Sequence, residues 1–180
     1  MRPGIFSLMA FVLLFGACTP EPGPMTGARE ATVKAEVAEA LTGLTEAMNA
    51  RDPEAVFAFY RQDESFYYLG CTSVLFGWQT FSSRVRPYYS TRTDLGIQRE
   101  ILWIQVLHPT VAVAALRGSS SEAEALFWTQ VLRKGEDGRW LVTYEHESWP
   151  GCPTPRGPHL GTTEMPGGET LPPAPGSQGN

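Results

Sequence analysis

The spacing of apolar residues predicts helices in the first half of the chain. Apolar side chains recur every three or four residues between Ala31 and Met48, which predicts one amphipathic helix ending near Asn49. Residues 52–54, Asp-Pro-Glu, favour a second helix start, because they supply an N-cap, a first-turn proline and an acid near the positive helix end. A third helix is predicted from residue 77 to residue 86, with a polar loop following Pro87.

The second half of the chain predicts strands. Residues 65–69 and 74–76 are expected to form a short hairpin. Four longer extended segments follow at 97–108, 111–116, 123–133 and 139–148, separated by turn residues, and they predict an antiparallel meander. Residues 151–180 are rich in Gly, Pro, Ser and Thr and are expected to be a disordered tail.

The last predicted strand carries the groups of greatest chemical interest. Strict alternation along a strand sorts its side chains onto two faces. One face would present Trp140, Val142, Tyr144, His146 and Ser148, and the other Leu141, Thr143, Glu145 and Glu147. The first row begins apolar and ends in hydrogen-bonding groups, which is typical of a strand that runs from a core into a pocket.

The N-terminus predicts export. Arg2 precedes an apolar run that is too short to span a bilayer, as in a signal peptide. The run ends in Phe15-Gly16-Ala17-Cys18, which resembles the lipobox of bacterial lipoproteins and implies lipidation of Cys18. Thr19 after this cysteine favours the outer membrane, facing the periplasm. Ordinary secretion with nearby cleavage is the alternative.

We therefore divide the chain into a signal peptide with lipobox (1–18), a Pro- and Gly-rich tether (19–27), a folded domain (28–150) and the tail. In an oxidising compartment, Cys71 and Cys152 are expected to form a disulfide, with two free thiols as the alternative. Two distant cysteines and scattered histidines lack metal-ligand spacing, so no metal site is expected. No cofactor is expected either.

The charge balance makes nucleic acid an unexpected partner. The chain has 14 Lys and Arg against 19 Asp and Glu, for a net charge of −5. Nucleic-acid binding requires clustered basic residues, and no basic stripe occurs in the sequence.

The order of predicted elements, together with several short motifs, resembles the nuclear-transport-factor-2-like superfamily. These motifs are residues 49–55, Phe59-Tyr60 followed by Asp63, residues 76–78, and residues 138–140 with His146 and Ser148. Within the superfamily, the chain is most similar to the SnoaL-like and DUF4440-like bacterial proteins. The resemblance implies an α+β fold, in which a cone-shaped, curved antiparallel sheet and three helices from the N-terminal half surround a pocket. It also implies that the domain can form a homodimer.

A cone formed by this chain is expected to have an aromatic lining suited to a flat or greasy small molecule. A packed core of aromatic residues is the alternative. The candidate pocket residues are Tyr60, Tyr67, Trp78, Trp103, Trp128, Tyr144 and His146.

His146 is the candidate acid or base, because its free pKa lies near neutrality. A structural histidine that hydrogen-bonds to the backbone or to Ser148 is the alternative. Asp63 is its possible partner, whereas alternation makes Glu145 and Glu147 poor ones. Glu100 and Glu124 are the candidate acids on other strands, but neither lies in a recognisable motif.

Three functional interpretations follow from the sequence. The favoured one is a membrane-anchored module that binds a small hydrophobic molecule or scaffolds a dimer, without defined catalysis. The alternatives are an acid/base enzyme of the isomerase, cyclase or hydrolase type that uses His146, and an interaction module that pairs through the exposed face of its sheet.

Overall fold

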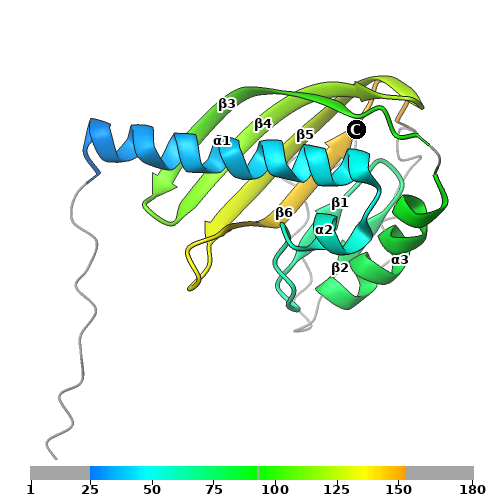
Figure 1. Ribbon diagram of the computed structural model, residues 1–180, viewed down its shortest axis with the longest axis horizontal. Helices are drawn as coiled ribbons and strands as arrows, with labels where there is room; N and C mark the ends of the chain where they lie inside the picture. The colour runs from blue at the N-terminus through cyan, green and yellow to red at the C-terminus, as the bar shows by residue number, and fades with distance from the viewer. Residues whose placement is uncertain (1–24, 93, 153–180) are drawn as a thin grey trace, which may run out of the picture.

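A curved sheet of six strands holds the helices on its concave side (Figure 1). The computed structural model describes residues 25–92 and 94–152. The strands are β1 (Tyr67–Leu69), β2 (Val74–Phe76), β3 (Gln98–His108), β4 (Val111–Ser120), β5 (Ala123–Lys134) and β6 (Trp140–Ser148). Their order in the sheet is β2-β1-β6-β5-β4-β3, and only the β1–β6 pair is parallel. This architecture confirms the predicted α+β class, the cone-shaped sheet and the four-stranded meander.

Helix α1 (Gly27–Ala50) lies across the sheet and buries the predicted apolar stripe, which includes Val37, Leu41 and Leu44. Two hydrogen bonds connect its C-terminal end to the start of β3: the Asn49 Nδ2 donates to the Ile97 carbonyl at 2.8 Å, and the Ile97 N–H donates to the Asn49 Oδ1 at 2.9 Å. These bonds fix the helix end beside the sheet. Helix α2 (Pro53–Phe57) follows, with Asp52 as its N-cap.

Helix α3 (Trp78–Thr91) is longer than the sequence predicts, because it continues through Pro87. A proline inside a helix costs about 3 kcal/mol or more through the lost hydrogen bond and a steric clash. Burial of Tyr89, which follows the proline in the helix and is only 6 % exposed, offsets part of this cost. The expected polar loop is therefore helical up to Thr91, and it places Tyr88 and Tyr89 over the concave side of the sheet.

A β-bulge in β6 changes which side chains face inward. Val131 of β5 pairs with Tyr144, but the next residue, Leu132, pairs with Val142, so Thr143 has no opposite residue. An extra residue of this kind shifts the alternation of the strand. Val142 before the bulge and Glu145 after it both face inward and are buried.

Backbone contacts with the segment after α2 hold the bulge in place. The Val142 N–H donates to the Phe59 carbonyl, and the Arg61 N–H donates to the Val142 carbonyl, both at 2.9 Å. The Thr143 hydroxyl donates to the Val131 carbonyl at 3.1 Å. The chain leaving α2 is thereby anchored beside the bulge.

A disulfide between Cys71 and Cys152 links the β1–β2 turn to the segment after β6, with Cα atoms 5.2 Å apart. The predicted signal peptide, Cys18 and almost all of the expected tail lie outside the described residues. None of the helices in the described part of the chain is long and apolar enough to cross a membrane.

Candidate functional site

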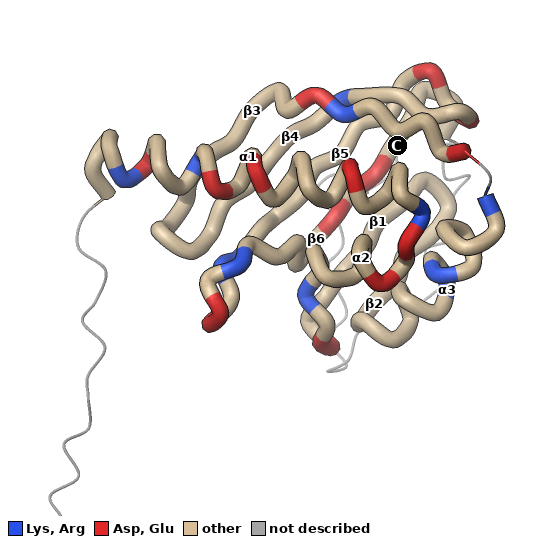
Figure 2. The backbone as a smooth tube through the Cα atoms, in the orientation of Figure 1, with Lys and Arg blue, Asp and Glu red and all other residues tan. Residues whose placement is uncertain are grey.

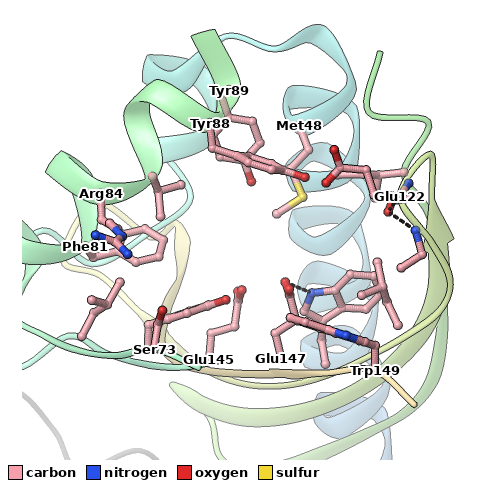
Figure 3. A pocket seen from close by; sticks show the side chains of 18 of the residues that line it. Met48, Ser73, Phe81, Arg84, Tyr88, Tyr89, Glu122, Glu145, Glu147 and Trp149 are labelled. Carbon is pink, nitrogen blue, oxygen red and sulfur yellow. Dashed lines mark hydrogen bonds between the residues drawn. The ribbon is translucent and has the colours of Figure 1, made fainter. Parts of the chain in front are cut away.

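A cavity of about 760 Å³ lies between the concave face of the sheet, the C-terminal part of α1 and helix α3 (Figure 3). Its size falls in the range of small-molecule sites. Most of its wall is aromatic or aliphatic. The apolar and aromatic lining residues include Met48, Tyr60, Tyr68, Leu75, Phe81, Val85, Tyr88, Tyr89, Leu126, Trp128 and Trp149.

Two glutamates of β6 form the polar floor of the cavity, and Figure 3 shows both carboxyl groups pointing into it. Glu145 is 3 % exposed. Its Oε2 accepts a hydrogen bond from the Tyr60 hydroxyl at 2.9 Å and another from the Gln130 Nε2. Burial raises the pKa of Glu145, whereas the positive charge of Arg99 and these two hydrogen bonds lower it.

Glu147 lies two residues further along the same face. Its Oε2 accepts a hydrogen bond from the Trp128 Nε1 at 2.8 Å. Burial, followed by the nearby charge of Glu145, raises the pKa of Glu147 to about 7. A carboxyl group with this pKa is present in both protonation states at neutral pH, which suits proton exchange or the binding of a charged group.

Arg99 of β3 completes a polar network beneath the aromatic wall. Its Nη2 donates to the Gln130 Oε1 at 2.7 Å, and its guanidinium lies 5.0 Å from the centre of the Trp128 ring. The Nε and Nη1 atoms of Arg99 are buried and have no hydrogen-bond partner among the described residues. The network thus runs from Tyr60 through Glu145 and Gln130 to a buried cation.

Of the seven predicted pocket residues, two line the cavity and five lie elsewhere. Tyr60 and Trp128 line the cavity. Trp78 packs edge-on against Phe57, with ring centres 5.0 Å apart, outside the cavity lining. Tyr67 stacks on Tyr144 at 5.4 Å in the β1–β6 pair. Trp103 is 49 % exposed on β3.

His146 and Tyr144 lie on the convex face of the sheet, which corrects the expectation that they face the hollow. Both follow the bulge, and they pair with Thr129 and Val131, which alternate with the inward Trp128 and Gln130 of β5. Neither lines the cavity.

The other predicted acids also occupy places that the sequence does not reveal. Asp63 stabilises the loop before β1, where its Oδ1 accepts from the Ser65 N–H at 2.9 Å. Glu100 forms an exposed ion pair with Arg117 at 2.7 Å. Glu124 is exposed and lies at the edge of the cavity.

Sequence reasoning missed the two inward glutamates. Their spacing of two residues in an apolar strand already indicates a shared face. Which face that is depends on the bulge at Thr143, which the sequence pattern does not mark. Tyr88 and Tyr89 were missed for a different reason, namely the expected end of α3 at Pro87.

The surface outside the cavity bears on the other expectations. Large apolar side chains are exposed on β3 and β5, namely Leu102, Trp103, Leu107 and Phe127. The homodimer remains a prediction, and this exposed apolar face offers a surface for it.

Lys and Arg are scattered over the described residues rather than clustered (Figure 2). No group of three or more His, Cys, Asp or Glu within the described ranges is arranged to hold a metal ion.

The chain belongs to the SnoaL-like domain family, whose match covers residues 37–151. A search of the curated proteins gives no significant match. The fold and the family together define an α+β protein of the nuclear-transport-factor-2-like superfamily.

Solved structures of the same superfamily resemble the whole domain. An NTF-2 like protein of unknown function from Shewanella oneidensis is 24 % identical with a TM-score of 0.58, over 64 % of this chain and 98 % of its own. A putative dehydratase of the NTF2-like family from Streptomyces avermitilis is 17 % identical with a TM-score of 0.56, over 66 % of this chain and 97 % of its own. At these identities the likeness establishes the fold.

The raised pKa of Glu147 predicts a pH-dependent cost in stability. The group ionises near its ordinary value of 4.5 when unfolded and near 7 when folded, so between these values the native state holds the extra proton. Stability should therefore fall as the pH rises through this window and level off above it. Each pKa unit corresponds to about 1.4 kcal/mol, and most of the shift from 4.5 to about 7 is expressed between pH 4.5 and 8, so wild type should lose about 3 kcal/mol relative to Glu147→Gln over this range.

The measurement is urea unfolding of both proteins at several pH values. Glutamine keeps an oxygen that can accept from the Trp128 indole, so the variant should remain folded. Parallel stability curves for the two proteins would show that Glu147 titrates normally.

Proposed function

We propose that this SnoaL-like domain binds a small, largely apolar molecule inside its cavity. The observation that carries the proposal is a wall of aromatic and aliphatic side chains around a floor with two carboxyl groups. Pockets for small molecules combine an apolar lining with a few polar groups that set the orientation of the ligand.

The hydrogen bonding of the two carboxyl groups supports the binding of a ligand in the cavity. Protein interiors are close-packed, and buried carboxyl groups are costly unless something compensates their charge. The Glu145 Oε1 and the Glu147 Oε1 accept no hydrogen bond from any described residue, whereas both Oε2 atoms do. One oxygen of each carboxyl group is therefore available to a ligand.

A tryptophan introduced into the cavity should block binding of the neutral dye Nile red. Val85 of α3 lines the cavity, so Val85→Trp should weaken the dye affinity at least roughly tenfold by occupying the space. The matched control is Gln79→Trp, which adds the same side chain to an exposed position of α3. Its affinity should stay within about twofold of wild type.

The measurement is a fluorescence titration, with urea unfolding to check that each variant is folded. Undiminished binding to Val85→Trp would place the dye elsewhere, and Phe127→Ala would then test the exposed convex face. Native mass spectrometry of the purified protein would show any molecule that co-purifies with it.

Acid/base catalysis is the second candidate function, and the observation that favours it is the carboxyl group of Glu147, which points into the cavity and whose pKa is raised to about 7 by burial and by the nearby charge of Glu145. This reassigns the role that the sequence suggested for His146, which lies outside the cavity. Two structural neighbours are described as a putative dehydratase and a ketosteroid isomerase-like protein, and their names are compatible with chemistry in such a cavity.

The elimination of 5-nitrobenzisoxazole would test Glu147 as a base without knowledge of the natural substrate. A carboxylate removes the proton of the ring C–H bond. The electron pair of that bond forms the third bond of the nitrile, and the N–O bond breaks to give a coloured phenolate. The rate should rise with pH around a midpoint of about 7, because only ionised Glu147 is basic. Glu147→Gln should slow the reaction at least roughly tenfold.

His146→Gln is the matched control, since it changes the neighbouring residue on the opposite face. Its rate should equal that of wild type. If His146→Gln were slow and Glu147→Gln were fast, the original assignment of the base to His146 would be right.

We also propose that the domain is exported and held on a membrane through lipidated Cys18. The support is the sequence alone: the apolar run after Arg2 and the small residues that lead into the cysteine. The full chain produced in a bacterial host should incorporate a labelled fatty acid and sediment with membranes, whereas Cys18→Ser should do neither. Equal labelling of both proteins would rule out this anchor.

A further inference from the structure

We propose that the ligand is a small apolar molecule bearing one protonated amine, which Glu145 and Glu147 bind at the floor of the cavity. The inference rests on the proposed binding function and specifies the ligand class. The first support is the distribution of charge. The charged lining residues are four glutamates and one arginine, Arg84.

The floor of the cavity is acidic without a cation in the lining beside it. Figure 3 shows the two glutamates side by side below the open space, while Arg84 lies on the wall next to Phe81. Arg84 is exposed, so its charge is well solvated. Arg99, whose Nε and Nη1 atoms are buried, lowers the pKa of both glutamates through its charge. It nevertheless donates to Gln130 rather than to either glutamate, and it does not line the cavity.

The aromatic side chains near the two glutamates suit a cation. Tyr60, Tyr68, Tyr89 and Trp128 all line the same space as the two glutamates. Aromatic faces attract ammonium groups through their quadrupole, and this attraction strengthens when water is excluded. A protonated amine can donate three hydrogen bonds, and a short spacer would let it reach both free carboxylate oxygens.

Tyr89 gives an independent sign that a polar ligand group belongs here. Its side chain is only 6 % exposed, lines the cavity and points into it (Figure 3). Its hydroxyl forms no hydrogen bond with any other residue that the structure describes. The hydroxyl is not among the fully buried atoms without a partner, so it opens onto the cavity, where a polar group of a bound molecule could hydrogen-bond to it.

Three indole compounds of similar size and different charge test the proposal by calorimetry: tryptamine, a cation; tryptophol, neutral; and indole-3-acetate, an anion. At pH 8 tryptamine should bind at least roughly tenfold more tightly than tryptophol, and indole-3-acetate should bind most weakly. This preference should shrink severalfold at pH 6, where Glu147 is mostly protonated. The charged or titrating groups around Glu147 are Glu145, Arg99, Tyr68, Tyr88 and Tyr89.

Glu147→Gln should reduce the preference for tryptamine to within about threefold. The matched control is Glu124→Gln, which removes an exposed charge at the edge of the cavity and should retain the preference. The comparison of pH 8 with pH 6 uses wild-type protein alone, so the proposal stays testable if a variant fails to fold.

The failures can be told apart. Equal binding of tryptamine and tryptophol would overturn the amine inference and leave the apolar binding function intact. Tightest binding of indole-3-acetate would overturn it in favour of an anion held by Arg84. Binding of none of the three would overturn the inference, and the proposed function would fall as well if Nile red bound Val85→Trp undiminished.

Discussion

The unpaired Thr143 in β6 is the constraint on which the site depends. Without this extra residue, strict alternation would place Tyr144 and His146 on the same inward face as Trp140 and Val142. Both glutamates would then face outward. With it, the buried part of the strand ends at Val142 and the carboxyl groups enter the cavity. One irregularity in the backbone therefore lets a single strand contribute to the core at one end and to a polar floor at the other.

The inward carboxyl groups impose an electrostatic cost that the surrounding residues only partly offset. Tyr60 and Gln130 donate to Glu145, and Trp128 donates to Glu147. The remaining effect of burial still raises the pKa of both acids. Functional sites commonly retain such unfavourable groups, because full neutralisation would remove the property that a ligand or a proton transfer uses.

Much of the fold could be predicted from the sequence, because periodicity reports which residues are buried over long, regular elements. The apolar stripe of α1 and the four strands of the meander are of this kind. The site was less predictable, because it depends on two irregular positions. Pro87 lies inside α3, where burial of Tyr89 offsets part of the local preference of proline to end a helix. The bulge at Thr143 depends on backbone contacts with residues 59–61.

Family membership and chemical function rest on different parts of this chain. The curved sheet and its helices establish the SnoaL-like fold, which proteins of very different sequence share. The backbone after the bulge offers two inward positions, 145 and 147, whatever residues occupy them. Apolar residues there would make the floor of the same cavity hydrophobic, whereas two glutamates make it acidic and titratable near neutral pH. The chemistry of this domain is therefore set by the side chains at these two positions rather than by its architecture.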